Sequence, residues 1–187
     1  SKPAISLLNS FSAPVIVEFK QSTDDLFAIL EFETDFTSVW MTKKKLDYIA
    51  LEKIASDQPN VENVISRVYE ILINKMDKRS LLAKLLEPLN DNEYFSRLLE
   101  TTTPDPKAIQ TDLRKYEDLY KRYFKEFSIT YFKSFIHNRQ YLRENSNYQE
   151  RQLACALIFL NKGTNFLDDF LDIIFNTSNN MSLKVSC

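Results

Sequence analysis

The chain has 187 residues and a single glycine, Gly163. Glycine supplies left-handed turns and lets a backbone approach a ligand closely, so a chain almost without it lacks the devices that depend on those properties. The phosphate-cradling loop, the dinucleotide-binding fingerprint and the nucleophile elbow each need glycines at fixed spacings, and all three are excluded. We expect a protein made of regular elements and polar connections, and we do not expect an enzyme.

Residues that commonly bind metals or act as nucleophiles are few. His137 is the only histidine and has no acidic residue three or four positions away, whereas a catalytic histidine usually has an orienting carboxylate. Cys155 and Cys187 are the only cysteines, which excludes a zinc site of cysteine and histidine and favours a reducing compartment. Three carboxylates begin a predicted helix, where the helix dipole favours negative charge: Asp168, Asp169 and Asp172. We predict no catalytic residue, no metal site and no cofactor.

The N-terminal part of the chain contains runs that are typical of β-strands. Val15–Lys20 is rich in β-branched residues, and Leu26–Glu33 alternates Phe27 and Ile29 with Leu30 and Phe32. A polar connector joins the two runs, which predicts a hairpin, and Thr37–Met41 is the candidate third strand. Three such strands form a stable antiparallel sheet only if helices cover one face.

The remainder of the chain shows helical periodicity. We predict helices over residues 43–56, 80–87, 90–99, 106–142 and 148–162, one that Asn60 caps, and one that follows Thr164. The Pro-containing segment 101–106 divides the chain into an N-terminal region of hairpin and helices, 1–100, and a helical region, 105–176, followed by a polar tail, 177–187. The predicted fold class is α+β, mainly α, with a small N-terminal antiparallel sheet covered by helices and a C-terminal helical bundle.

The long predicted helix separates its charges from its aromatic residues. On a wheel of about 100° per residue, the aromatic side chains of residues 121–143 mostly share one arc, and the cations lie on the other. These cations are Lys121, Arg122, Lys125, Lys133, Arg139 and Arg143. One interpretation is an ordinary amphipathic helix with solvated cations. The other is a basic stripe that binds an acidic protein segment or the phosphates of a nucleic acid.

A second candidate interface is the edge of the predicted sheet. The first strand has no internal proline and no charge before Glu18, so an uncovered edge would accept a strand from a partner. Trp40 either covers the sheet or joins the interface. The strand-edge candidates are Val15, Val17, Phe19 and Trp40.

The stretch Leu26–Trp40, which ends in Thr34-Asp35-Phe36-Thr37-Ser38-Val39-Trp40, resembles part of the head domain of DNA end-joining scaffold proteins. The resemblance implies a strand that precedes a helical pair. That head needs further strands after the helices and then a coiled-coil stalk, which this sequence does not predict, so we assign no membership.

These observations favour a non-enzymatic module for protein–protein interaction, an adaptor or scaffold subunit of an intracellular multiprotein complex. The alternative is a nucleic-acid-associated factor, of the chromatin or DNA-repair type, that binds a phosphate backbone through the basic stripe. No apolar run reaches the length of a membrane span, and Ser1–Ala4 opens no signal-peptide pattern. We therefore expect a location in the cytoplasm or nucleus, without secretion, and a protein partner. The oligomeric state does not follow from the sequence.

Overall fold

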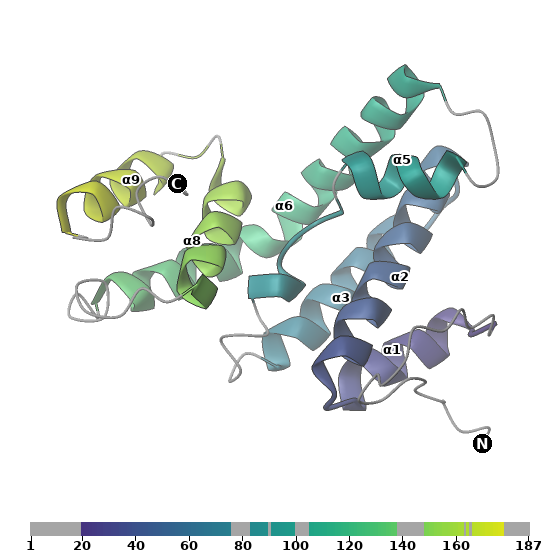
Figure 1. The fold of residues 1–187 in the computed structure, drawn as a ribbon, viewed down its shortest axis with the longest axis horizontal. Coiled ribbons are helices and arrows are strands. Elements are labelled where there is room, and N and C mark those ends of the chain that lie inside the picture. The colour runs from purple at the N-terminus through teal and green to yellow at the C-terminus, as the bar shows by residue number, and fades with distance from the viewer. Residues whose placement is uncertain are drawn as a thin grey trace. The chain divides into compact units, whose positions relative to one another are not determined.

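The structure is a computed structural model, and it describes residues 20–75, 83–89, 91–99, 105–137, 148–162, 164 and 166–177 (Figure 1). The elements within these residues are all α-helices. They are α1 (Thr23–Phe32), α2 (Phe36–Ala55), α3 (Val61–Asn74), α5 (Asp91–Leu99), α6 (Pro106–His137), α8 (Tyr148–Asn161) and α9 (Phe166–Thr177). None of these helices is both long enough and apolar enough to cross a lipid bilayer.

The predicted N-terminal antiparallel sheet is wrong, and with it the α+β fold class: the described part of the chain is mainly helical and contains no strand. Leu26–Glu33 belongs almost entirely to α1, and Thr37–Met41 lies within α2. Local capping explains the difference, because the Ser22 hydroxyl accepts from the Asp25 amide and the Asp25 carboxylate accepts from the Ser22 amide. The first predicted strand lies outside the described residues except for Lys20.

The chain divides into two compact units. Unit 1 comprises Ser1–Lys75 and Pro88–Leu119, and unit 2 comprises Met76–Glu87 and Tyr120–Cys187. The helix α6 is therefore shared, with its first part in unit 1 and its second part in unit 2.

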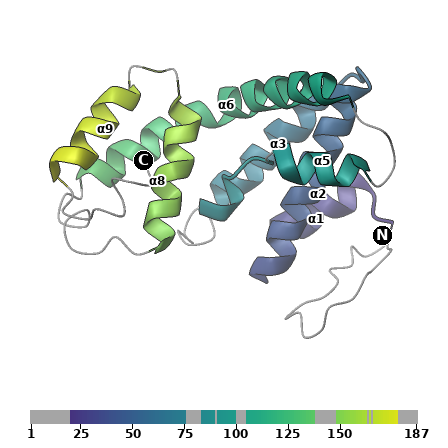
Figure 2. The ribbon, with the colours of Figure 1, turned by 45° about the horizontal axis from the view of Figure 1, so that its top comes forward.

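The core of unit 1 is built on α1, α2 and α3, each of which packs against the other two (Figures 1 and 2). Leu30, Val39, Leu46 and Leu51 are among the fully buried side chains of α1 and α2. The α5 helix is tied to α2 by an ion pair between Lys44 Nζ and Glu93 Oε2, at 2.6 Å. Together these helices and the first part of α6 give unit 1 an interior in which leucine, isoleucine and valine predominate.

The connection between α2 and α3 turns without glycine. Asp57 has φ of 50° and Asn60 has φ of 68°, both in the left-handed region that glycine occupies most easily. Asn and Asp tolerate this region better than other residues, because their short polar side chains can bond locally. Asn60 is the N-cap residue of α3, as the sequence predicted, but its side chain makes no capping hydrogen bond.

Unit 2 packs α8 against α9 and buries the middle of α6 (Figure 2). The Tyr120 ring stacks on Phe124 with centroids 4.4 Å apart, and its hydroxyl donates to the Leu85 carbonyl at 3.2 Å. The Asn161 side-chain amide donates to Ser128 Oγ and to the Leu157 carbonyl. The contact with Ser128 joins α8 to α6, whereas the contact with Leu157 lies within α8.

Candidate functional site

The structure describes three side chains of the predicted basic stripe, all in the part of α6 that belongs to unit 2. Lys121 is partly buried, and its ammonium lies 4.6 Å from the centroid of the Phe159 ring, a cation–π contact with α8. Arg122 and Lys125 are exposed. The side chain of Lys133 and all of Arg139 and Arg143 lie outside what the structure describes. Lys121 thus serves packing within unit 2, and two cations of the described stripe face solvent.

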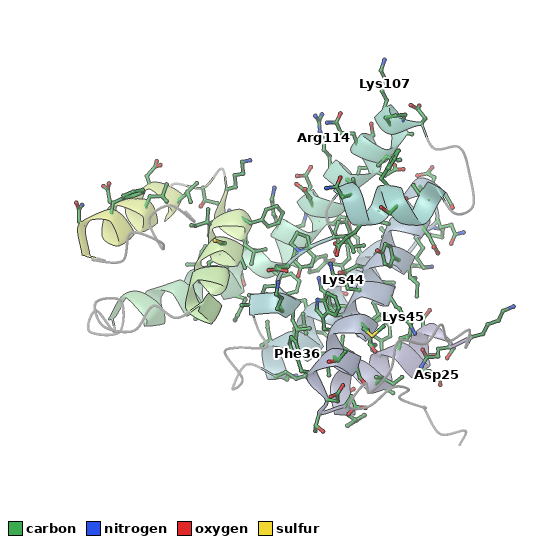
Figure 3. All side chains as sticks on the ribbon, viewed as in Figure 1. Asp25, Phe36, Lys44, Lys45, Lys107 and Arg114 are labelled. Atoms are coloured by element: carbon green, nitrogen blue, oxygen red, sulfur yellow. The ribbon has the colours of Figure 1, made fainter. Side chains whose placement is uncertain are left out.

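Acidic residues interrupt the exposed face of α6. Four exposed residues follow one another at intervals of one turn and alternate in sign: Arg114, Asp118, Arg122 and Glu126. The side chain of Arg114 points away from the helix (Figure 3). Alternating charges at this spacing stabilise a solvated helix and cancel its field at a distance. This pattern favours the interpretation of the face as an ordinary solvated surface.

The predicted stripe covers residues 121–143 and so does not include Asp118, which makes the described part of this face less basic than the prediction implies.

Trp40 does not lie at a strand edge, because it belongs to α2. The Lys44 ammonium sits 5.6 Å from the centroid of its ring, and the same ammonium pairs with Glu93 on α5. Trp40 thus contacts the same lysine that ties α5 to α2 inside unit 1, and Figure 3 labels this Lys44 on α2. The other strand-edge candidates, Val15, Val17 and Phe19, lie outside the described residues.

A buried charged cluster joins α2 to α6 within unit 1. Lys43 Nζ lies 2.7 Å from Asp47 Oδ2, and the two residues are 0% and 3% exposed. Burial raises the pKa of the Asp47 carboxyl above its ordinary value of 3.8, while Lys43 and a hydrogen bond from the buried Tyr116 of α6 oppose the rise. The cluster does not contact solvent, so it positions helices and does not meet a substrate.

Sequence reasoning missed this cluster. Lys43 and Asp47 lie four residues apart, which is the usual spacing of an exposed ion pair on a helix surface. The signal that was available is that both fall on the same stripe of α2 as Leu46, Ala50 and Ile54, which are buried.

The most exposed large apolar side chain among the described residues lies where α1 meets α2. Phe32, the last residue of α1, is 75% exposed, and Phe36, the first residue of α2, is 44% exposed. Glu31 is exposed beside Phe32, and Asp35 is partly exposed beside Phe36. We call these four residues, Glu31, Phe32, Asp35 and Phe36, the corner surface. Figure 3 shows Phe36 at the end of α2 where that helix begins.

Sequence reasoning missed the corner surface as well, because it placed Phe32 on a face of a predicted strand. The available signal was Ser22 followed three residues later by Asp25, which marks a helix start.

The corner surface carries a negative potential. The last turn of α1 contains no basic residue, so the partial negative charge of the helix C-terminus adds to that of Glu31. Glu33 Oε1 accepts from the amides of Thr34 and Asp35, at 2.7 and 3.0 Å. Asp35 Oδ2 accepts from the Ser38 amide at 2.8 Å, which begins α2. The Lys75 ammonium donates to the Glu33 carbonyl at 2.7 Å and offsets part of this charge.

The described residues contain no group of three or more His, Cys, Asp and Glu side chains that could hold a metal ion. Cys155 is a free, partly buried thiol on α8. Burial raises the pKa of this thiol above its ordinary value of 9.0, and the charge of Glu87 raises it further. A thiol in such surroundings is protonated at neutral pH and is a poor nucleophile.

No protein-family model matches this chain, and neither the curated proteins nor the solved structures include a match. Its function is therefore argued from the geometry and charge of its own surfaces.

Proposed function

We propose that this protein is a non-enzymatic protein-interaction module, an adaptor or scaffold subunit of an intracellular multiprotein complex, and that it binds its partner through the corner surface. The observation that carries the proposal is the 75% exposure of Phe32. Burying such a side chain would stabilise a protein by roughly 1.5–3 kcal/mol, and here that stabilisation is not used in the described fold. Exposed aromatic side chains are the anchors on which protein interfaces most often depend.

A second aromatic side chain strengthens the argument. A single exposed apolar residue is ordinary, but Phe36 follows Phe32 after one short connection and is itself 44% exposed. Charged residues border both rings, as at the rim of an interface. The corner surface therefore combines an aromatic centre with a polar border.

The corner is also held in place before any partner arrives. The amides between α1 and α2 are bonded to Glu33, and the start of α2 is bonded to Asp35. Because these contacts already order the backbone, a partner that binds here loses little free energy to ordering the loop.

Photo-cross-linking in the native host cell tests the proposal. A photoreactive phenylalanine analogue replaces Phe32 in the full chain, and a matched variant carries it at Met41, which is also exposed but lies five residues after Phe36, about 140° around α2. We expect a discrete protein adduct from position 32 and none from position 41. The same adducts from both positions, or none from position 32, would refute the proposal.

A further inference from the structure

We propose that the corner surface recognises a basic protein segment, one that places an arginine or lysine over Phe32 against Glu31 and an apolar residue on Phe36. This inference rests on the proposed function, and it specifies the chemistry of the partner. Cations within unit 1 show which surroundings this fold uses to bind positive charge.

Unit 1 holds two cations between an aromatic ring and a carboxylate. The Arg67 guanidinium of α3 lies 4.6 Å from the centroid of the Phe27 ring on α1, and Arg67 Nη1 lies 3.8 Å from Asp24 Oδ1 on the same helix. Lys44 is held in the same way between Trp40 and Glu93. A ring attracts a cation to its face, and a neighbouring carboxylate adds to that attraction.

The corner surface contains an exposed ring, Phe32, and an exposed carboxylate, Glu31, at adjacent positions of α1, whereas Asp24 and Phe27 lie three residues apart. Within the described part of the chain, no cation lies over the Phe32 or Phe36 ring, and Glu31 makes no ion pair. Phe32 lies five residues after Phe27, which holds Arg67, and so about 140° further around α1. A cation from another molecule could bind against Phe32 and Glu31 at the end of α1, as Arg67 binds against Phe27 and Asp24 nearer its start.

The charge of the site selects the class of partner. Glu31 and Asp35 both contribute negative charge, so an acidic peptide or a nucleic acid would be repelled. Residues 1–19 of this chain contain one cation, Lys2, and one acid, Glu18, and so have no net charge with which to satisfy the corner. The complementary occupant is a positively charged segment of another protein.

Titration of the full chain with two labelled peptides tests the inference. The probes are a nine-residue peptide that repeats Arg-Leu-Ser and a matched peptide that repeats Glu-Leu-Ser. Binding of each peptide is measured by backbone amide NMR shifts of the protein and by fluorescence anisotropy of the peptide. We expect the arginine peptide to shift the amides of residues 31–36 and the glutamate peptide to leave them unchanged. Raising the salt to about 0.5 M is expected to weaken the arginine peptide severalfold, because its ion pairs are exposed.

Matched variants locate the effect. Phe32→Ala is expected to weaken the arginine peptide about fivefold, and Glu31→Lys about tenfold, as the loss of one cation–π contact and the reversal of one charge imply. Glu70→Lys makes the same change in net charge at an exposed position of α3 and is expected to leave the affinity unchanged. Equal effects of the two charge reversals, or equal binding of the two peptides, would overturn the inference.

The two proposals fail in different ways. An adduct from position 32 that maps to a segment without lysine or arginine refutes the basic partner and leaves the interaction module standing. The absence of any adduct from position 32 refutes the interaction module itself.

Discussion

Lys43, Asp47 and Tyr116 place an ion pair and a hydroxyl in the interior of unit 1. Removing two charges from water costs several kcal/mol per ion, and their mutual attraction offsets that cost only when the geometry is good and further hydrogen bonds are made. Here the ammonium and the carboxylate are 2.7 Å apart, and the buried Tyr116 of another helix also favours the charged form of the carboxylate. The cluster therefore specifies which face of α6 meets α2 more than it adds to stability.

Removing one charge of this pair is expected to be costly. Lys43→Met leaves the Asp47 carboxylate buried without a cation and should lower the free energy of unfolding by about 3–5 kcal/mol. The double variant Lys43→Met with Asp47→Leu removes both charges and should recover most of that loss. Urea unfolding followed by circular dichroism measures both values. A double variant that is no more stable than Lys43→Met would contradict this account of the pair.

The raised pKa of Asp47 gives stability a defined dependence on pH. The folded protein holds the Asp47 proton more tightly than the unfolded chain does, so this group lowers the free energy of unfolding as the pH rises from 3.8 through the raised folded pKa. Below 3.8 the group is protonated in both states and this penalty is absent.

The comparison with Asp47→Asn isolates this effect, because the variant cannot titrate at position 47. The free energy of unfolding of the parent minus that of the variant should fall as the pH is raised from about 3.5 to 7. Urea unfolding at stepped pH measures the difference. A difference that stays constant or rises with pH would show that burial does not control this carboxyl.

At the scale of elements, the capping residues at the helix starts determine which segments form helices. Asp35 lies in extended conformation with its carboxylate on the Ser38 amide, and it begins a helix of 20 residues directly after α1 has ended. The same residue belongs to the corner surface. Loss of this cap would therefore affect both the stability of α2 and the position of Phe36.

Two substitutions of Asp35 distinguish the contribution of its hydrogen bond to stability from that of its negative charge. Asp35→Ala should lower the free energy of unfolding by about 1 kcal/mol, because the Ser38 amide loses its acceptor. Asp35→Asn keeps an acceptor oxygen and should cost only a few tenths of a kcal/mol. Thermal unfolding of the two variants under the same buffer distinguishes them. Equal losses would mean that the charge of Asp35, and not its hydrogen bond, stabilises the start of α2.

The helices could be predicted where periodicity and capping signals agree. The long helix that begins at Pro106 and the helix of Tyr148–Asn161 were predicted close to their observed bounds. The prediction failed for Leu26–Glu33 because its apolar residues suit both periods, alternating along a strand and also forming the buried helical stripe of Leu26, Ile29 and Leu30. Because this segment was predicted as a strand, the corner surface at the end of α1 was not predicted either. Burial of Lys43 and Asp47 was signalled by their position on the apolar stripe of α2, but the contribution of Tyr116 comes from a residue far along the chain, which no local pattern encodes.

At the scale of the whole molecule, charge is spread without a dominant sign. The formal net charge is −2, and the exposed cations of α6 alternate with acids over the described turns. Binding of a phosphate backbone requires several unopposed cations along one face, since each contact releases counterions. The described part of α6 does not provide them.

We therefore expect no saturable binding of the full chain to duplex DNA at about 50 mM salt, as measured by fluorescence anisotropy of a labelled 20-base-pair duplex. The double variant Lys121→Glu with Lys125→Glu should behave as the parent does. Tight binding that falls steeply with salt and is flattened by these two substitutions would instead support a nucleic-acid-associated function.

The two units are interleaved along the polypeptide, and this has a consequence for how the molecule is made. Residues 76–87 belong to unit 2, residues 88–119 belong to unit 1, and the chain from residue 120 onward belongs to unit 2 again. During translation, unit 1 cannot fold completely until residue 119 has left the ribosome, which happens long after its first three helices have emerged. No single cut of the chain can therefore yield both units intact, because each unit is built from two separate stretches of sequence.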